Sequence, residues 1–162
     1  MTGMRTTLRC LALGVWLCAA PALAQSVPAP PVPAAMVRYA PEIAAAQGRL
    51  DAFMSAFNAR DVTAYEATFN FPHVRFASGQ VTIINPGFHK PDMFTTGSLS
   101  DWDHSAWLRR EVIHASPDKV HIDTRFARYR KDGSLIAAFD SIYIVTRVNG
   151  RWGIQGRSSF AP

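Results

Sequence analysis

The last third of the chain alternates apolar and polar residues with the two-residue period of β-strands. From residue 105 to 160, runs rich in Val, Ile, Thr, Phe, Tyr and Trp are separated by three turn sequences: Ser116-Pro117-Asp118-Lys119, Asp132-Gly133 and Asn149-Gly150. The two Gly-containing pairs favour tight hairpin loops, because glycine readily adopts the positive φ that such loops require. The pattern predicts four consecutive antiparallel strands.

The loop lengths also predict which residues face each other across these strands. The simplest closure of each turn forms one polar row across the four strands: Glu111, Thr124, Ser141 and Ser158. The same face carries most of the large apolar residues, together with Arg109, and we expect it to be buried. The opposite, wetter face carries two predicted cross-strand pairs: His114 with His121, and Arg125 with Asp140. The second is an ion pair worth roughly 0.2 to 1 kcal/mol.

Helical periodicity precedes these strands. Apolar residues recur at spacings of three and four along one stripe, with Pro41 in the first turn: Ile43, Leu50, Phe53, Met54 and Phe57. Asp61 is a typical cap for a second, shorter helix. Residues 71–77 and 80–84 read as a hairpin, and a short helix is expected from Asp92 toward Thr96. This order predicts an α+β fold in one domain.

The N-terminal residues have the pattern of a signal peptide. Arg5 and Arg9 precede an apolar run, and Ala22-Leu23-Ala24 is a small-residue cleavage site. We therefore expect residues 1–24 to be removed and the protein to be exported to the periplasm or secreted. Both cysteines lie in this segment, so the mature chain has no disulfide. Residues 25–40, rich in Pro and Ala, are expected to form a disordered spacer before a domain at 41–162.

The charge pattern disfavours nucleic acid as a partner. Without the two arginines of the signal segment the chain has 15 basic and 12 acidic residues, a formal charge of +3. Its arginines are interleaved with acids, and the dense run Arg128-Tyr129-Arg130-Lys131 reads as a solvated hairpin tip. After signal cleavage no membrane segment is expected. No phosphate loop, serine elbow or Cys-His arrangement is present, so we expect no cofactor.

The order of the predicted elements resembles the nuclear transport factor 2-like superfamily, which includes ketosteroid isomerases and polyketide cyclases. Similar motifs are Phe57-Asn58-Ala59-Arg60-Asp61, Val120-His121-Ile122-Asp123 and the last hairpin, residues 149–154. The resemblance covers residues 42 to 160. It implies a cone-shaped, bent antiparallel sheet of about six strands, wrapped around two to three N-terminal helices. A pocket would then open between the concave face of the sheet and the first helix.

The resemblance also implies positions for chemistry. The isomerases of the superfamily use an aspartate base on the first strand, near Ala77 here, and a donor on a late strand, near Tyr143. No carboxylate lies at the first position, where His73 and Arg75 share the side of the strand. This difference disfavours steroid isomerisation and leaves the pocket as the expected feature.

Three residues are candidates for catalysis: Glu111, His73 and Tyr143. On an apolar face, desolvation would raise the pKa of Glu111 and suit it to proton transfer; the alternative is a sheet-edge carboxylate paired with an arginine. His73 is a candidate base or a structural histidine. The predicted ligand-binding residues are Tyr143, Thr124, Ser141, Ser158, His73 and Trp107, although the hydroxyls also suit mutual hydrogen bonding across the strands.

A metal site has one weak lead. His114 and His121 are predicted neighbours, with Asp123 on the same face, but zinc normally requires three or four aligned ligands. We therefore expect no metal.

Three functions follow, in order of preference. The first is a non-catalytic pocket for a small, mostly apolar molecule. The second is a cofactor-independent isomerase, dehydratase or cyclase that uses Glu111 or His73 with Tyr143. The third is assembly as a homodimer, since Ile142 and Ile144 lie on the wetter face.

Overall fold

The computed structural model describes residues 34–162, and the expected signal segment lies outside them. The helical elements are η1 (Ala34–Tyr39), α1 (Ala40–Asn58), α2 (Val62–Glu66), η2 (Pro91–Phe94) and η3 (Gly97–Leu99). The strands are β1 (Phe69–Ala77), β2 (Gln80–Ile84), β3 (His104–Ala115), β4 (Lys119–Tyr129), β5 (Leu135–Val148) and β6 (Arg151–Ser159). None of the described helices is long and apolar enough to cross a bilayer.

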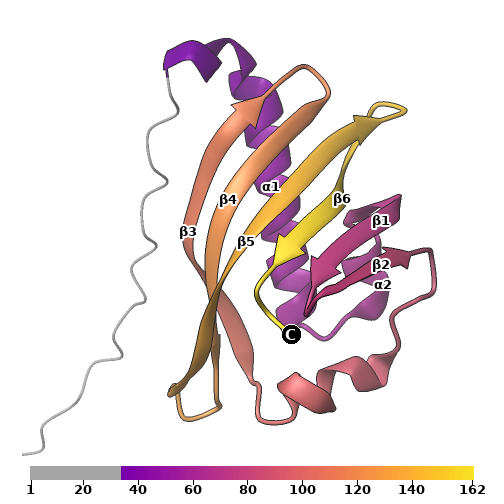
Figure 1. Ribbon diagram of the computed structural model, residues 1–162, viewed down its shortest axis with the longest axis vertical. Coiled ribbons are helices and arrows are strands. Elements are labelled where there is room, and N and C mark those ends of the chain that lie inside the picture. Colours follow the sequence, from indigo (N-terminus) through magenta and orange to yellow (C-terminus); the bar gives the residue numbers. More distant parts are fainter. Residues whose placement is uncertain (1–33) are drawn as a thin grey trace, which may run out of the picture.

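The six strands form one curled sheet in the order β2-β1-β6-β5-β4-β3, with α1 lying across one face (Figure 1). The four-stranded meander and the separate β1–β2 hairpin match the predicted α+β cone. One pairing differs, because β1 runs parallel to β6. The β1–β2 hairpin joins the sheet by pairing β1 with β6. The loop lengths in the sequence do not determine whether this pairing is parallel or antiparallel.

Local signals explain where the helices begin. Pro41 lies in the first turn of α1, where its missing N–H is not needed. Asp61 caps α2 as predicted, accepting a hydrogen bond from the Ala64 amide at 2.9 Å. The expected spacer, 25–40, lies mostly outside the described residues, but its end forms η1, which leads directly into α1. Helical structure therefore begins before the predicted domain start at residue 41.

The core lies between α1 and the concave face of the sheet. Phe53 of α1 is at its centre, with ring centroids 5.0 Å from Tyr65, 5.6 Å from Tyr143 and 6.1 Å from Phe69. The predicted apolar stripe of the first helix is buried here, and Leu50 is fully inaccessible to solvent. Burial of this stripe is the main force that holds the helix on the sheet.

The predicted register is correct along most of the β4–β5 hairpin, and in the other two hairpins of the meander only near the turn. Thr124 pairs with Ser141 as expected. On β3, irregularities at Ile113 and Leu108 shift the pairing, so that Glu111 faces Asp123. On β6, an extra residue at Gln155 shifts the pairing again, so that Ser141 faces Ser159 and not Ser158. Each bulge moves the residues beyond it to the other face of the sheet.

Candidate functional site

A cavity of about 240 Å³ lies between the C-terminal half of α1 and the concave face of the sheet. The long loop that carries η2 and η3 contributes residues to one wall, and α2 and all six strands contribute to the others. Most of the lining side chains are aromatic or aliphatic. The apolar part of the lining is Phe53, Met54, Phe57, Phe69, Ile84, Phe88, Met93, Leu99, Phe126 and Pro162.

His73 lies in the wall of this cavity on β1. Its ring stacks on Phe69 at 4.4 Å, and only 3% of the residue is exposed. Nδ1 lies 3.1 Å from the carbonyl oxygen of Ile154, so the Nδ1–H tautomer donates this bond. Burial lowers the pKa of His73 to about 4. The histidine is therefore neutral at neutral pH.

Two tyrosines face the same cavity. Tyr143 is 1% exposed, and its hydroxyl oxygen accepts a hydrogen bond from Arg157 at 3.4 Å. Burial raises the pKa of Tyr143, and burial raises that of Tyr65 to about 12. Both phenols therefore keep their protons and are able to donate a hydrogen bond.

Three arginines also line the cavity: Arg75 of β1, Arg128 of β4 and Arg157 of β6. The predicted solvated hairpin tip is correct for Arg130 and Lys131, which are exposed, but wrong for Arg128, which is only 6% exposed. Its side chain points inward because it follows Thr124 and Phe126 in the alternation of β4. No Asp or Glu side chain is among the described residues that line the cavity.

A carboxylate–histidine pair stands at the wall. Glu66 accepts hydrogen bonds from the Gly87 amide at 2.7 Å, the His89 amide at 2.9 Å and His89 Nδ1 at 3.0 Å. Burial opposes ionisation of Glu66, but these bonds outweigh it and hold its pKa below the usual range. Burial also lowers the pKa of His89, despite the carboxylate. The pair fixes the Nδ1–H tautomer of His89 and leaves Nε2 unprotonated.

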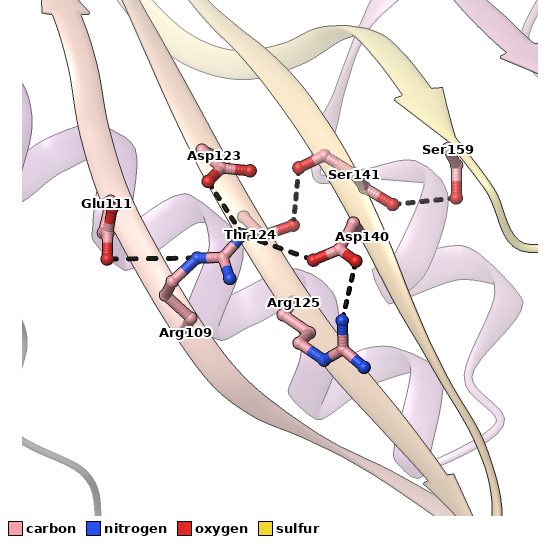
Figure 2. Close-up of polar contacts among 8 residues, drawn as sticks. All are labelled: Arg109, Glu111, Asp123, Thr124, Arg125, Asp140, Ser141 and Ser159. Carbon is pink, nitrogen blue, oxygen red and sulfur yellow. Dashed lines mark hydrogen bonds and ion pairs between the residues drawn. The ribbon is translucent and has the colours of Figure 1, made fainter.

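The predicted row of hydroxyls is internally satisfied (Figure 2). Thr124 donates to the Ser141 carbonyl oxygen at 3.0 Å, and the Ser141 hydroxyl donates to that of Ser159 at 2.8 Å. Ser158 is exposed on the other face, because of the bulge at Gln155. The described residues that line the cavity include none of this row, so its structure fits the alternative of mutual hydrogen bonding.

Glu111 does not lie on the apolar face. The bulge at Ile113 turns it outward, where its side chain is 48% exposed and 3.9 Å from Arg109 (Figure 2). Arg109 is outward for the same reason and contacts Asp123 at 2.8 Å and Asp140 at 3.2 Å. The expected desolvation of Glu111 is therefore wrong. The predicted pair of Arg125 with Asp140 is confirmed at 2.7 Å.

The remaining candidates lie outside the cavity lining. Trp107 is half-buried on the inner face, and its ring is 5.7 Å from that of Tyr143. His114 and His121 are cross-strand partners as predicted, with ring centroids 6.2 Å apart. In residues 34–162 no three potential ligands gather into a metal site. On the outer face, Ile142 is 41% exposed and Ile144 is half-buried.

A curled sheet over a helix, with a cavity between them, is the architecture of the cystatin-like α+β proteins. The family model for NTF2-like protein (DUF6841) matches residues 42–159. The chain belongs to this NTF2-like family. The comparison with curated proteins finds no match.

Solved structures agree with this fold. An NTF2-like protein with a cystatin-like fold from Novosphingobium aromaticivorans is 10% identical, with a TM-score of 0.63 over 78% of this chain and 86% of that one. A ketosteroid isomerase-like protein from Erwinia carotovora atroseptica is 19% identical, with a TM-score of 0.56 over 74% and 95%. A cystatin-like protein of unknown function from Nostoc punctiforme is 12% identical, with a TM-score of 0.59 over 75% and 91%. At these identities the likeness concerns the fold alone.

Sequence reasoning missed four polar residues of the cavity region: Arg128, Arg157, Glu66 and His89. The sequence did contain the signal for Arg128, because the two-residue alternation of β4 places it on the same face as Thr124 and Phe126. Simple alternation from the Asn149-Gly150 turn places Arg157 on the outer face, and the bulge at Gln155 turns it to the inner face. Glu66 and His89 are joined across a loop, and no local pattern indicates that contact.

Proposed function

We propose that this protein binds one small, mostly apolar molecule in the cavity beneath α1. The observation that carries the proposal is the aromatic-lined cavity of about 240 Å³. Apolar cavities of about 150 Å³ hold benzene, and pockets for drug-sized molecules measure roughly 300 to 1,000 Å³. The expected ligand therefore has one or two rings.

Native mass spectrometry of freshly purified protein is the first test, because it detects a molecule retained through purification. Calorimetric titration with 2-naphthylmethanol and 2-naphthoate is the second. Thr82 lines the cavity, whereas the neighbouring Ile83 is 62% exposed on the other side of β2. Thr82→Trp fills the cavity and is expected to weaken binding at least about tenfold, a loss of about 1.4 kcal/mol. Ile83→Trp is the matched control.

Binding of either probe at one per chain, sensitive to Thr82→Trp alone, supports the proposal. Absence of binding by both probes contradicts it, and so does equal binding by the two tryptophan variants. The mass spectrum also tests export, since cleavage after Ala24 gives a chain that begins at Gln25.

A second candidate function is cofactor-independent proton transfer, and the Glu66–His89 pair favours it. A carboxylate that orients a neutral imidazole leaves Nε2 free to accept a proton. His73 is less suited to this role, because its low pKa makes it a weak base. Glu111 is excluded by its position on the outer face.

Deuterium exchange at the acidic carbon of 2-tetralone, a neutral two-ring ketone, tests this candidate. His89→Gln is expected to reduce catalysed exchange by about 10²-fold or more. His114→Gln on the outer face is the control and is expected to have no effect. Exchange at the uncatalysed rate in the wild type contradicts proton transfer and leaves the binding proposal untouched.

A further inference from the structure

Three positive charges share the cavity although their residues are far apart in the sequence. Arg75, Arg128 and Arg157 come from three different strands, and only the curling of the sheet brings them together. Burial, together with repulsion from Arg157 and Arg75, lowers the pKa of Arg128 to about 10. Such clustering of like charges is unfavourable unless a negative charge compensates it.

The three guanidinium groups have unused hydrogen-bond donors. A guanidinium carries five N–H bonds. Within the described chain each of the three makes one hydrogen bond: Arg75 to the Ala161 carbonyl oxygen, Arg128 to the Ser98 hydroxyl, and Arg157 to the Tyr143 hydroxyl. The Nε atoms of Arg128 and Arg157 are buried with no partner among residues 34–162.

No described carboxylate side chain compensates these charges. On the outer face, Arg109 and Arg125 are paired with aspartates. None of the ion pairs among the described residues involves a cavity arginine. Pro162, the last residue, also lines the cavity, and no ion pair joins its carboxylate to these arginines. Glu66 is already held by His89 and Gly87. No Asp or Glu side chain among residues 34–162 therefore balances the three charges in the cavity.

We propose that the ligand is a small organic acid whose carboxylate binds the three arginines and whose ring body fills the aromatic part of the cavity. This rests on the proposed binding function and adds the charge class of the ligand. A carboxylate accepts paired hydrogen bonds from a guanidinium, which suits the unused donors of Arg128 and Arg157. The apolar part of the lining disfavours a bare inorganic anion, because it offers such an ion no hydrogen bonds.

The test compares probes with one ring system and different charge. Wild-type protein is titrated calorimetrically with 2-naphthoate, with the neutral 2-naphthylmethanol and with inorganic phosphate. Naphthoate is expected to bind at least about tenfold more tightly than the alcohol, since hydrogen bonds to charged groups are individually strong. Phosphate alone is expected to bind far more weakly than naphthoate.

Arg128→Met removes one cavity charge while keeping a long apolar side chain. It is expected to reduce the preference for naphthoate several-fold and to keep the affinity for the alcohol. Arg130→Met is the matched control. Arg130 is exposed, and its replacement also removes one positive charge from this part of the chain. Arg75→Met replaces Arg128→Met if that variant does not fold.

Each result has one meaning. Equal affinity of the wild type for naphthoate and the alcohol overturns the organic acid while the binding function stands. Phosphate as tight as naphthoate also overturns it, in favour of an inorganic anion. An equal effect of Arg130→Met and Arg128→Met shows only a net-charge effect and overturns the assignment of the arginines. If neither naphthyl probe binds, the proposed function itself fails with it.

Discussion

The buried imidazole of His73 predicts a specific loss of stability in acid. The unfolded chain binds a proton at this histidine near its ordinary pKa of 6.5, but the folded protein does so only near pH 4. Between about pH 6.5 and about pH 4 the unfolded state binds more protons at His73 than the folded state does. The free energy of unfolding therefore falls as the pH falls through this range. Each pKa unit corresponds to about 1.4 kcal/mol, so the loss reaches about 3 kcal/mol at pH 4.

His73→Asn isolates this contribution. The asparagine amide can still donate to the Ile154 carbonyl oxygen, as Nδ1 does now, but it does not titrate. Urea unfolding followed by tryptophan fluorescence at pH 7.5, 6, 5 and 4 gives the stability of both proteins. His89 is also buried, and it contributes equally to both.

The quantity of interest is the difference in pH dependence between wild type and variant, since the substitution also changes packing. Wild type is expected to lose about 3 kcal/mol more than His73→Asn between pH 7.5 and pH 4. Parallel curves for the two proteins would refute the reasoning. An NMR titration with the His73 resonance shifting near pH 6.5 would refute it independently.

Other predictions concern packing and the outer face. Gly153→Ala is expected to lower thermal stability by about 1 to 3 kcal/mol, because the new Cβ would lie 2.8 Å from the backbone nitrogen of Asn70. The control is Gly48→Ala on α1, where the new Cβ would have open space. This variant is expected to be more stable by roughly 0.5 to 1 kcal/mol. Equal melting temperatures for the two would contradict this view of the contact. Leu50→Ala is expected to cost about 2 to 5 kcal/mol in urea unfolding, and a cost under 1 kcal/mol would mean that α1 is not anchored by this stripe. Asp140→Asn is expected to cost at most about 1 kcal/mol per partly exposed ion pair, and less in 1 M salt; a larger, salt-independent loss would argue against a surface network.

Local sequence determined most of the fold. Asn149 and Gly150 adopt positive φ values of 50° and 79° at the last hairpin, as their residue types predict. Asp61 caps its helix, and the stripe of Leu50 and Phe53 is buried. The turn and the cap depend on contacts within a few residues, and the stripe depends on the spacing of apolar residues along the helix. The sequence alone therefore predicts all three.

Only the tertiary structure decided which polar groups reach the cavity. The bulges at Ile113 and Gln155 reverse the two faces of their strands, which moves Glu111 outward and Arg157 inward. A bulge depends on how a strand twists against its neighbours. Gly153 and Gly156 flank the bulge at Gln155, but no glycine marks the one at Ile113. His73 and Tyr143 were candidates because of the family resemblance, and both line the cavity. The arginine cluster was not found, since Arg75, Arg128 and Arg157 meet only when the sheet closes over α1.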